Sequence, residues 1–193
     1  MVDDEIDEEL EEPLNNGIRI GLSGLPGAGK TAALLRVIRQ LEARGEMVGG
    51  MVTDEIEEAG HRVGFKVTDW MSKEEGVLAS VEYSSTTEVE GYGVDIDALN
   101  EIGVKAIERA IDQADVVVID EIGKMESESD AFIAAVKHAM DSRKNIIMTM
   151  HKKSRNPLLQ NIRKRDDVRI IEVTPVNKNI LPYKIERLLE GEY

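Results

Sequence analysis

The stretch Gly24-Leu25-Pro26-Gly27-Ala28-Gly29-Lys30-Thr31 decides the fold, because it matches the pattern G-x-x-x-x-G-K-[ST] at every fixed position. Residues 18–23 alternate in polarity before it, which predicts a β-strand, and the apolar spacing over 30–43 predicts an amphipathic helix after it. Glycines let a loop curl around an anion with its N–H groups pointing inward, and the helix adds the positive end of its dipole. We therefore predict a phosphate-binding loop from Gly24 to Ala32 that holds a nucleotide.

Two side chains of this loop and two acids farther along the chain predict the chemistry. Lys30 is placed to meet the β- and γ-phosphates, and the Thr31 hydroxyl is placed to bind Mg²⁺. The apolar run 116–119 predicts a strand covered on both faces, and it ends in Asp120 and Glu121. A desolvated carboxylate needs a partner, so we interpret Asp120 as a second Mg²⁺ ligand. Glu121 then serves as the base that aligns and deprotonates a water molecule, with Lys30 and Asp120 completing the catalytic set.

The rest of the chain predicts an α/β fold in which strands and helices alternate. Further strands are expected at 47–53, 145–150 and 168–173, which together with 18–23 and 116–119 predict a five-stranded parallel sheet flanked by helices. Further helices are expected over these ranges: 96–114, 129–142, 157–165 and 177–189. A β-hairpin around 61–83 is the one interruption, and we expect it to be an insertion outside the sheet.

The acid that directly follows Asp120 favours hydrolases in which an added strand lies between the P-loop strand and the acidic strand. For such a sheet the strand order is 5-1-4-3-2, and the added strand here is 145–150. That position would bring Thr149 and His151 beside the γ-phosphate as candidate phosphate sensors. The alternative for Thr149 is a buried strand residue, and for His151 a surface residue at a strand end.

The amino-acid composition excludes several classes of protein. The 193 residues contain no cysteine, which excludes a disulfide framework and thiolate chemistry, and no apolar run approaches the roughly 20 residues of a membrane span. Residues 1–12 hold eight acids and no base, which leaves 30 acids and 24 bases in residues 13–193. We expect residues 1–13 to form a disordered acidic tail and residues 14–193 a single cytoplasmic domain without membrane or nucleic-acid partners.

One concentration of basic residues in this acidic chain follows the strand expected at 145–150. It consists of Lys152, Lys153, Arg155, Arg163, Lys164 and Arg165. Arg155 is a candidate charge stabiliser close to the phosphates, whereas a solvated helix face is the plainer interpretation of the set. The few aromatic residues offer no stacking platform for single-stranded nucleic acid.

Six segments together resemble the small archaeal and bacterial nucleoside-triphosphatases related to the human cancer-related nucleoside-triphosphatase. They are GLPGAGKT (24–31), GGMVTDEIEEAGHRVGF (49–65), YGVDIDAL (92–99), VVIDEIGKMES (117–127), MHKKSRNPLLQNIRKR (150–165) and EVTPVNKNILP (172–182). The resemblance implies a RecA-like P-loop fold and Mg²⁺-dependent hydrolysis of ATP, GTP and other NTPs to NDPs. The family segment often written EIRE reads Glu55-Ile56-Glu57-Glu58 here, so Arg62 is the arginine of that region that is left as a candidate charge stabiliser.

Two other functions are consistent with a phosphate-binding loop. A nucleotide or small-molecule kinase would use the region 54–83 to cover an acceptor. A nucleotide-gated binding module would hydrolyse slowly on its own and serve a partner.

Overall fold

The structure is a computed structural model that describes residues 16–192, so the predicted acidic tail (residues 1–13) lies outside the described residues. Its strands are β1 (Arg19–Gly24), β2 (Val48–Glu58), β3 (His61–Asp69), β4 (Glu75–Ser80), β5 (Glu88–Val89), β6 (Tyr92–Val94), β7 (Val116–Ile122), β8 (Asn145–His151) and β9 (Val168–Glu172). Its helices are α1 (Lys30–Ala43), α2 (Ile96–Ala98), α3 (Lys105–Gln113), α4 (Asp130–Asp141), α5 (Pro157–Arg163) and α6 (Leu181–Leu189). A π-helical segment, Leu99–Val104, joins α2 to α3, and a short 3₁₀ turn, Glu126–Glu128, follows β7.

The sheet corrects the sequence-based prediction. It contains nine strands in the order β5-β6-β4-β3-β2-β7-β8-β1-β9 and is mixed, so the expectation of a five-stranded, all-parallel sheet is wrong. The neighbours β2-β7, β7-β8, β8-β1 and β1-β9 pair in parallel, whereas β2 through β6 pair antiparallel. The order 5-1-4-3-2 therefore describes only the parallel part of this sheet.

The hairpin expected outside the sheet is instead a continuation of it. β2 runs to Glu58, well beyond the predicted end at 53, and only Val48–Met51 pair with β7. The other edge of β2 pairs with β3 along almost its whole length, from Met51 opposite Asp69 to Glu58 opposite His61. An unpaired strand edge exposes a row of N–H and C=O groups, and the returning strand satisfies them. β4 and β6 then extend the same sheet outward.

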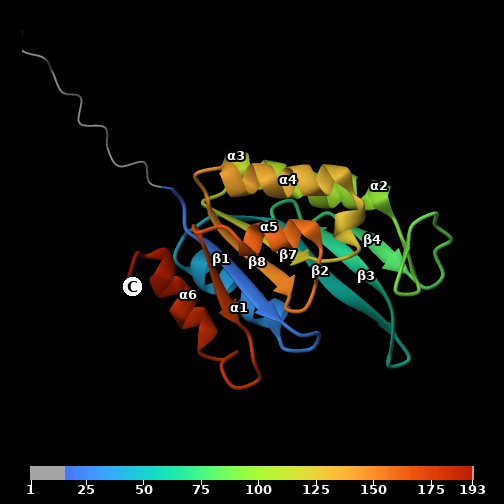
Figure 1. The fold of residues 1–193 in the computed structure, drawn as a ribbon, viewed down its shortest axis with the longest axis horizontal. Helices are drawn as coiled ribbons and strands as arrows, with labels where there is room; N and C mark the ends of the chain where they lie inside the picture. Colours follow the sequence, from blue (N-terminus) through green and yellow to red (C-terminus); the bar gives the residue numbers. More distant parts are fainter. Residues whose placement is uncertain (1–15, 193) are drawn as a thin grey trace, which may run out of the picture.

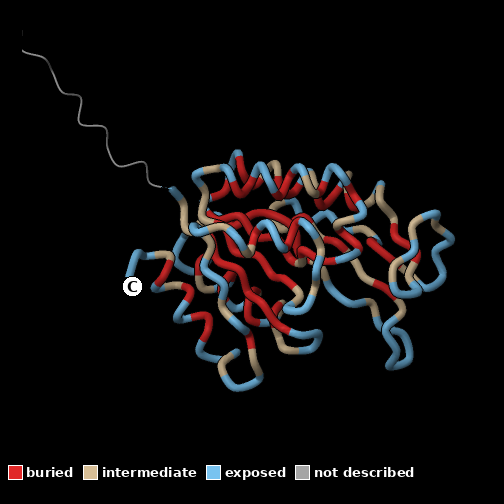
Figure 2. Tube along the Cα trace, viewed as in Figure 1, coloured by how far each residue is buried: buried red, intermediate tan, exposed pale blue. Residues whose placement is uncertain are grey.

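Two helical layers cover the parallel strands (Figure 1). Along β7, Val117 and Ile119 join a core with α3, α4 and α5, whereas Val116 and Val118 join a second core with α1 and α6. Side chains of a strand point alternately to opposite faces, which explains why a continuously apolar strand serves two cores. Figure 2 shows the resulting buried strands between exposed helix faces.

This arrangement positions the functional site at one edge of the sheet. The strands β1, β7 and β8 are parallel neighbours, so their carboxyl ends meet at the same edge. Crevices outside the carboxyl ends of parallel strands are the usual ligand sites of α/β sheets. Among residues 16–192, no helix has both the length and the apolar character to cross a membrane.

Candidate functional site

The loop between β1 and α1 has the backbone conformation of an anion cradle. Gly27 and Gly29 both adopt positive φ angles, 75° and 96°, which side-chain-bearing residues rarely do. Gly29 is the N-cap of α1 and has no side chain to occupy the free N–H groups of the first turn. Those N–H groups and the helix dipole therefore remain available to a negatively charged ligand.

Lys30 is held at the floor of this cradle. Its side chain is buried, its Nζ donates to the carbonyl oxygen of Gly24 at 3.0 Å, and it forms an ion pair with Glu121 Oε2 at 2.9 Å. An ammonium group has three N–H donors, so two are used and one is left for a ligand. The structure thus brings together the predicted lysine of the P-loop and the predicted base of β7.

Asp120 is the most constrained acid of the site. Its side chain is 0% exposed and accepts hydrogen bonds from the hydroxyls of Thr149 and Thr31 and from the backbone N–H of Thr53. The Thr31 Oγ1 atom lies 3.1 Å from each carboxylate oxygen. Burial raises the pKa of Asp120 to about 6, against the lowering effect of the hydroxyl donors.

The end of β7 departs from regular strand geometry where these acids lie. The pairing of β7 with β8 shifts register between Ile119 and Ile122, and the Asp120–Glu121 peptide bond is cis. Bulges of this kind re-aim side chains at sheet edges. Asp120 is fully buried, whereas the Glu121 side chain remains 31% exposed and forms an ion pair with Lys30.

A third acid, Glu126, converges on the same place from the 3₁₀ turn after β7. It is 6% exposed, and burial raises its pKa to about 8, with further raising by the charges of Glu121 and Asp120. Gly123 separates the two glutamates: a Cβ there would lie 2.8 Å from Glu126 Oε2 and 3.2 Å from Glu121 Oε1. Any residue other than glycine would therefore push against both carboxyl groups.

Asp120 and Thr31 have the donor set that suits Mg²⁺. In the described part of the chain no group of three or more His, Cys, Asp or Glu side chains could hold a metal by itself. Mg²⁺ is commonly bound by one or two protein ligands together with substrate phosphates and water, rather than by an all-protein cage. A buried carboxylate beside a hydroxyl at the N-terminus of α1 fits that chemistry.

The contacts of Arg62 are with Glu55, Tyr92 and Phe65 and not with the acids of this group. It lies on the β2–β3 hairpin, where its Nη1 donates to Glu55 Oε1 at 2.8 Å and its Nε to the Tyr92 hydroxyl at 3.2 Å. Its guanidinium carbon is 5.1 Å from the ring centre of Phe65 and 5.9 Å from that of Tyr92. These contacts hold the Arg62 side chain against the β2–β3 hairpin and Tyr92.

The loop after β8 lies beside the P-loop. The backbone N–H of Lys152 donates to Gly24 O at 3.0 Å, and Arg163 closes the loop by donating to the carbonyls of His151, Ser154 and Lys152. The His151 Nδ1 accepts from the backbone N–H of Lys153. Arg155 is exposed, and its guanidinium makes no hydrogen bond or ion pair within residues 16–192.

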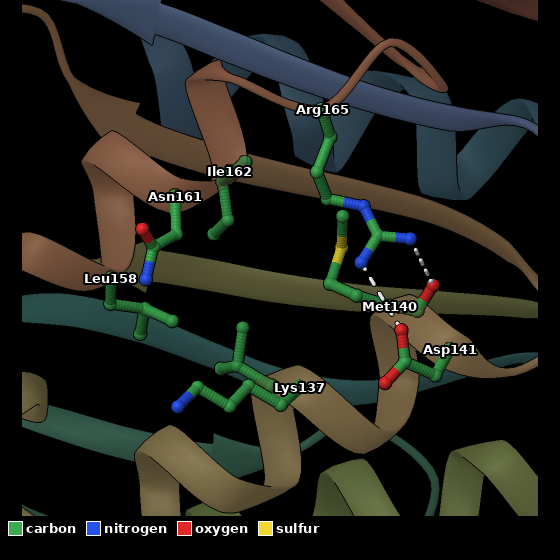
Figure 3. Close-up of a pocket in the computed structure, with 8 residues that line it drawn as sticks. Lys137, Met140, Asp141, Leu158, Asn161, Ile162 and Arg165 are labelled. Atoms are coloured by element: carbon green, nitrogen blue, oxygen red, sulfur yellow. Dashed lines mark hydrogen bonds and ion pairs between the residues drawn. The ribbon is translucent and has the colours of Figure 1, made fainter.

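A cavity lies elsewhere, between α4 and α5 (Figure 3). Leu158 and Ile162 face Met140 across it, and Arg165 closes one end through Asp141 and the Met140 carbonyl. No residue of the P-loop or of the β7 end lines it, so it is separate from the site described above.

The sequence did not indicate a role for Gly123 or for the Thr53 N–H. It indicated Thr149 as a candidate phosphate sensor, whereas the structure shows its hydroxyl donating to Asp120. The motif Asp-Glu-Ile-Gly-Lys-Met-Glu (120–126) contained the signal for Gly123, because a glycine between acids at the end of a buried strand indicates close approach. The Thr53 contact depends on how β2 runs past β7, which no local pattern reveals.

Comparisons with known proteins show the family to which the chain is similar. A model of the NTPase family matches residues 19–186. The chain is 35% identical over 175 residues to the nucleoside-triphosphatase THEP1 of Picrophilus torridus, covering 91% of this chain and 97% of that protein. It is 44% identical over 167 residues to the THEP1 of Thermofilum pendens, covering 86% and 92%.

Two solved structures share the fold. The crystal structure of THEP1 from the hyperthermophile Aquifex aeolicus superposes with a TM-score of 0.80 at 31% identity, covering 90% of this chain and 99% of that one. The solution structure of a human cancer-related nucleoside triphosphatase superposes with a TM-score of 0.78 at 30% identity, covering 92% and 100%.

Proposed function

Because this chain belongs to the NTPase family, we propose that it is a nucleoside-triphosphatase that releases the γ-phosphate of ATP, GTP and other NTPs in a Mg²⁺-dependent reaction. The observation that carries the proposal is the meeting of two P-loop side chains with two acids of β7. Thr31 Oγ1 lies 3.1 Å from the Asp120 carboxylate, and Lys30 Nζ lies 2.9 Å from Glu121 Oε2. The relatives are named as nucleoside-triphosphatases without a particular base, which supports a broad substrate class.

In the proposed mechanism the loop amides and Lys30 bind the phosphates and neutralise the charge that develops during transfer. The oxygen of a water molecule forms a bond to the γ-phosphorus while the bond to the β–γ bridging oxygen breaks, which leaves NDP and phosphate. Glu121 aligns the water and accepts its proton. Thr31 and Asp120 would hold Mg²⁺, which would supply additional positive charge to the phosphates.

The ion pair between Lys30 and Glu121 supports this division of roles. Lys30 keeps one N–H for phosphate while it holds Glu121, so the base and the phosphate-binding amine share one location. Asp120 lies deeper, with no exposed surface, and is therefore suited to hold a cation rather than to exchange protons with solvent.

A phosphate-release assay over ATP, GTP, CTP and UTP, each with Mg²⁺ and with excess EDTA, tests the proposal. We expect release from all four in Mg²⁺ and none above background in EDTA. The matched variant is Asp120→Asn, which keeps the size of the side chain and removes its charge, and we expect it to need more Mg²⁺. Transfer of labelled γ-phosphate to an added nucleoside or monophosphate, without free phosphate, would overturn hydrolysis in favour of a kinase.

A further inference from the structure

Thr149 lies on β8, the strand between the P-loop strand β1 and the acidic strand β7. Its neighbour on β1 is Leu22, and its side chain is 0% exposed. The Thr149 hydroxyl donates to Asp120 Oδ1. The residue singled out from the sequence as a candidate phosphate sensor is therefore engaged with an acid of the site.

The surroundings of Thr149 and Asp120 determine what this hydrogen bond can do. Both side chains are fully buried, so solvent cannot supply a donor in place of the hydroxyl. A hydroxyl has a single proton, and that of Thr149 is used by Asp120. A threonine side chain is also stiff, because its branched Cβ restricts rotation about χ1. Thr149 is thus a rigid donor aimed at one carboxylate oxygen.

The other donors of Asp120 come from different elements. Thr31 at the start of α1 lies 3.1 Å from each carboxylate oxygen, and the N–H of Thr53 comes from β2. Thr149 approaches from the central strand, on the Oδ1 side. Three elements therefore fix the carboxylate between them, and only Thr31 belongs to the phosphate loop.

We propose that Thr149 is a positioning residue: its hydroxyl holds the Asp120 carboxylate in the orientation in which it faces Thr31, and so prepares the pair for a divalent cation. This rests on the proposed function, in which Asp120 and Thr31 bind Mg²⁺. Thr149 itself touches no phosphate, because its only proton is donated to Asp120 and its side chain has no exposed surface.

The test compares Thr149→Val, which keeps the shape and removes the donor, with Thr149→Ser, which keeps the donor. Binding of β,γ-imido-ATP is measured by isothermal titration in MgCl₂ and in EDTA, beside the Mg²⁺ dependence of phosphate release. Hydrogen bonds to charged groups typically change binding by about tenfold or more, so we expect Thr149→Val to lose about tenfold in Mg²⁺-dependent affinity. Its affinity in EDTA should stay within about threefold of the parent by the same argument, since no phosphate contact is lost.

Two controls make the comparison specific. Thr149→Ser should restore most of the Mg²⁺ dependence, and Thr68→Val, at a threonine of β3 whose hydroxyl donates to Glu75 at 3.3 Å, should change neither value. If Thr149→Val does not fold, as judged by circular dichroism, Thr149→Ala takes its place. An unchanged Mg²⁺ dependence, or an equal loss of affinity in EDTA, would overturn the proposal, the latter because it indicates direct phosphate contact.

Failure of the proposed function gives a different result. A parent protein that binds Mg²⁺ with the analogue yet releases no phosphate would refute hydrolysis, while the ratio of affinities with and without Mg²⁺ would still test Thr149.

Discussion

The chain has two acidic segments at strand ends, Asp120–Glu126 at the end of β7 and Asp54–Glu58 at the end of β2, and they have opposite surroundings. In the first, Asp120 is 0% and Glu126 6% exposed, and burial raises their pKa values to about 6 and 8. In the second, the Glu55 side chain is 50% exposed and is paired with Arg62, whose side chain is 45% exposed. The difference shows that position at the sheet edge, and not charge content, determines which acids can do chemistry.

The physical reason is desolvation. A carboxylate removed from water interacts strongly with every nearby proton donor, cation and acid, whereas an exposed ion pair is screened and typically contributes 0.2 to about 1 kcal/mol. At the end of β7, burial therefore raises the pKa values of Asp120 and Glu126. Glu121 and Asp120 also contact Lys30 and Thr31, respectively. The segment at the end of β2 holds four acids and no base, against three acids and one lysine in Asp120–Glu126, yet water screens most of its charge.

The largest effect on the buried segment should come from its counter-ion. We expect Lys30→Ala to abolish phosphate release and to weaken nucleotide binding about tenfold or more, because the amine is the buried cation between the loop and Glu121. Phosphate release and isothermal titration measure the two effects. Lys105→Ala is the matched control, at an exposed ion pair on α3, and should change neither. Hydrolysis by Lys30→Ala near the parental rate would place the site elsewhere.

The next effect compares the same substitution in the two segments. Glu121→Gln keeps the size and a polar contact to water but cannot accept its proton, so we expect phosphate release to fall by about 10²–10⁴-fold. Glu55→Gln on the hairpin should leave the rate within about twofold, because it breaks only an exposed pair. Binding of β,γ-imido-ATP to Glu121→Gln should persist. Near-parental turnover by that variant would show that another group, such as Glu126, acts as the base.

The parts of the site that lie within one short segment could be predicted from the sequence. The glycine pattern before Lys30 and the apolar run before Asp120 each indicate their chemistry locally. The parallel strands around them could also be predicted, because apolar runs alternate with amphipathic helices.

The parts that depend on pairing between distant strands could not be predicted. Alternation over 61–69 indicates a strand but not its partner, so the sequence does not predict that β3 continues the sheet. The convergence of Glu126 with Glu121 over Gly123 requires the 3₁₀ turn that follows β7, and spacing alone does not fix such a turn. Thr149 was singled out for its strand position, yet its hydrogen bond to Asp120 depends on a rotamer.

A smaller effect concerns stability rather than turnover. The pKa of Glu126 is about 8 in the folded protein against an ordinary 4.5, so the folded state binds more protons between these values. Stability must then fall as pH rises from about 4.5 to 8, by roughly 5 kcal/mol at most for the full shift. We expect Glu126→Gln to remove this slope and to be more stable than the parent at pH 8.

Urea unfolding at pH 5 and pH 8, in EDTA and without nucleotide, measures that slope. Part of the decrease in stability as pH rises toward 6 is caused by Asp120, whose pKa is also raised. That part should remain in Glu126→Gln. Glu58→Gln, at an exposed position of the hairpin, should keep the parental pH dependence. Equal slopes for the parent and Glu126→Gln would show that Glu126 is ionised in the folded protein.

The smallest effect is expected at Arg62, and it tests the exposed side of the comparison. If Arg62 stabilised the transferring phosphate, its removal would cost about 10³–10⁵-fold in rate, as for arginine fingers. In the structure its guanidinium instead contacts Glu55, Tyr92 and the ring of Phe65.

We therefore expect Arg62→Ala to change phosphate release by no more than about threefold. The free energy of unfolding should change by about 1 kcal/mol or less, since exposed ion pairs and cation–π contacts each contribute little. Phosphate release by Arg155→Ala is measured for comparison, because Arg155 lies in the loop beside Gly24. Its guanidinium makes no hydrogen bond or ion pair within residues 16–192. A thousandfold loss in Arg62→Ala with unchanged melting would mean that the hairpin swings its arginine into the site, and the exposed segment would then share in the chemistry of the buried one.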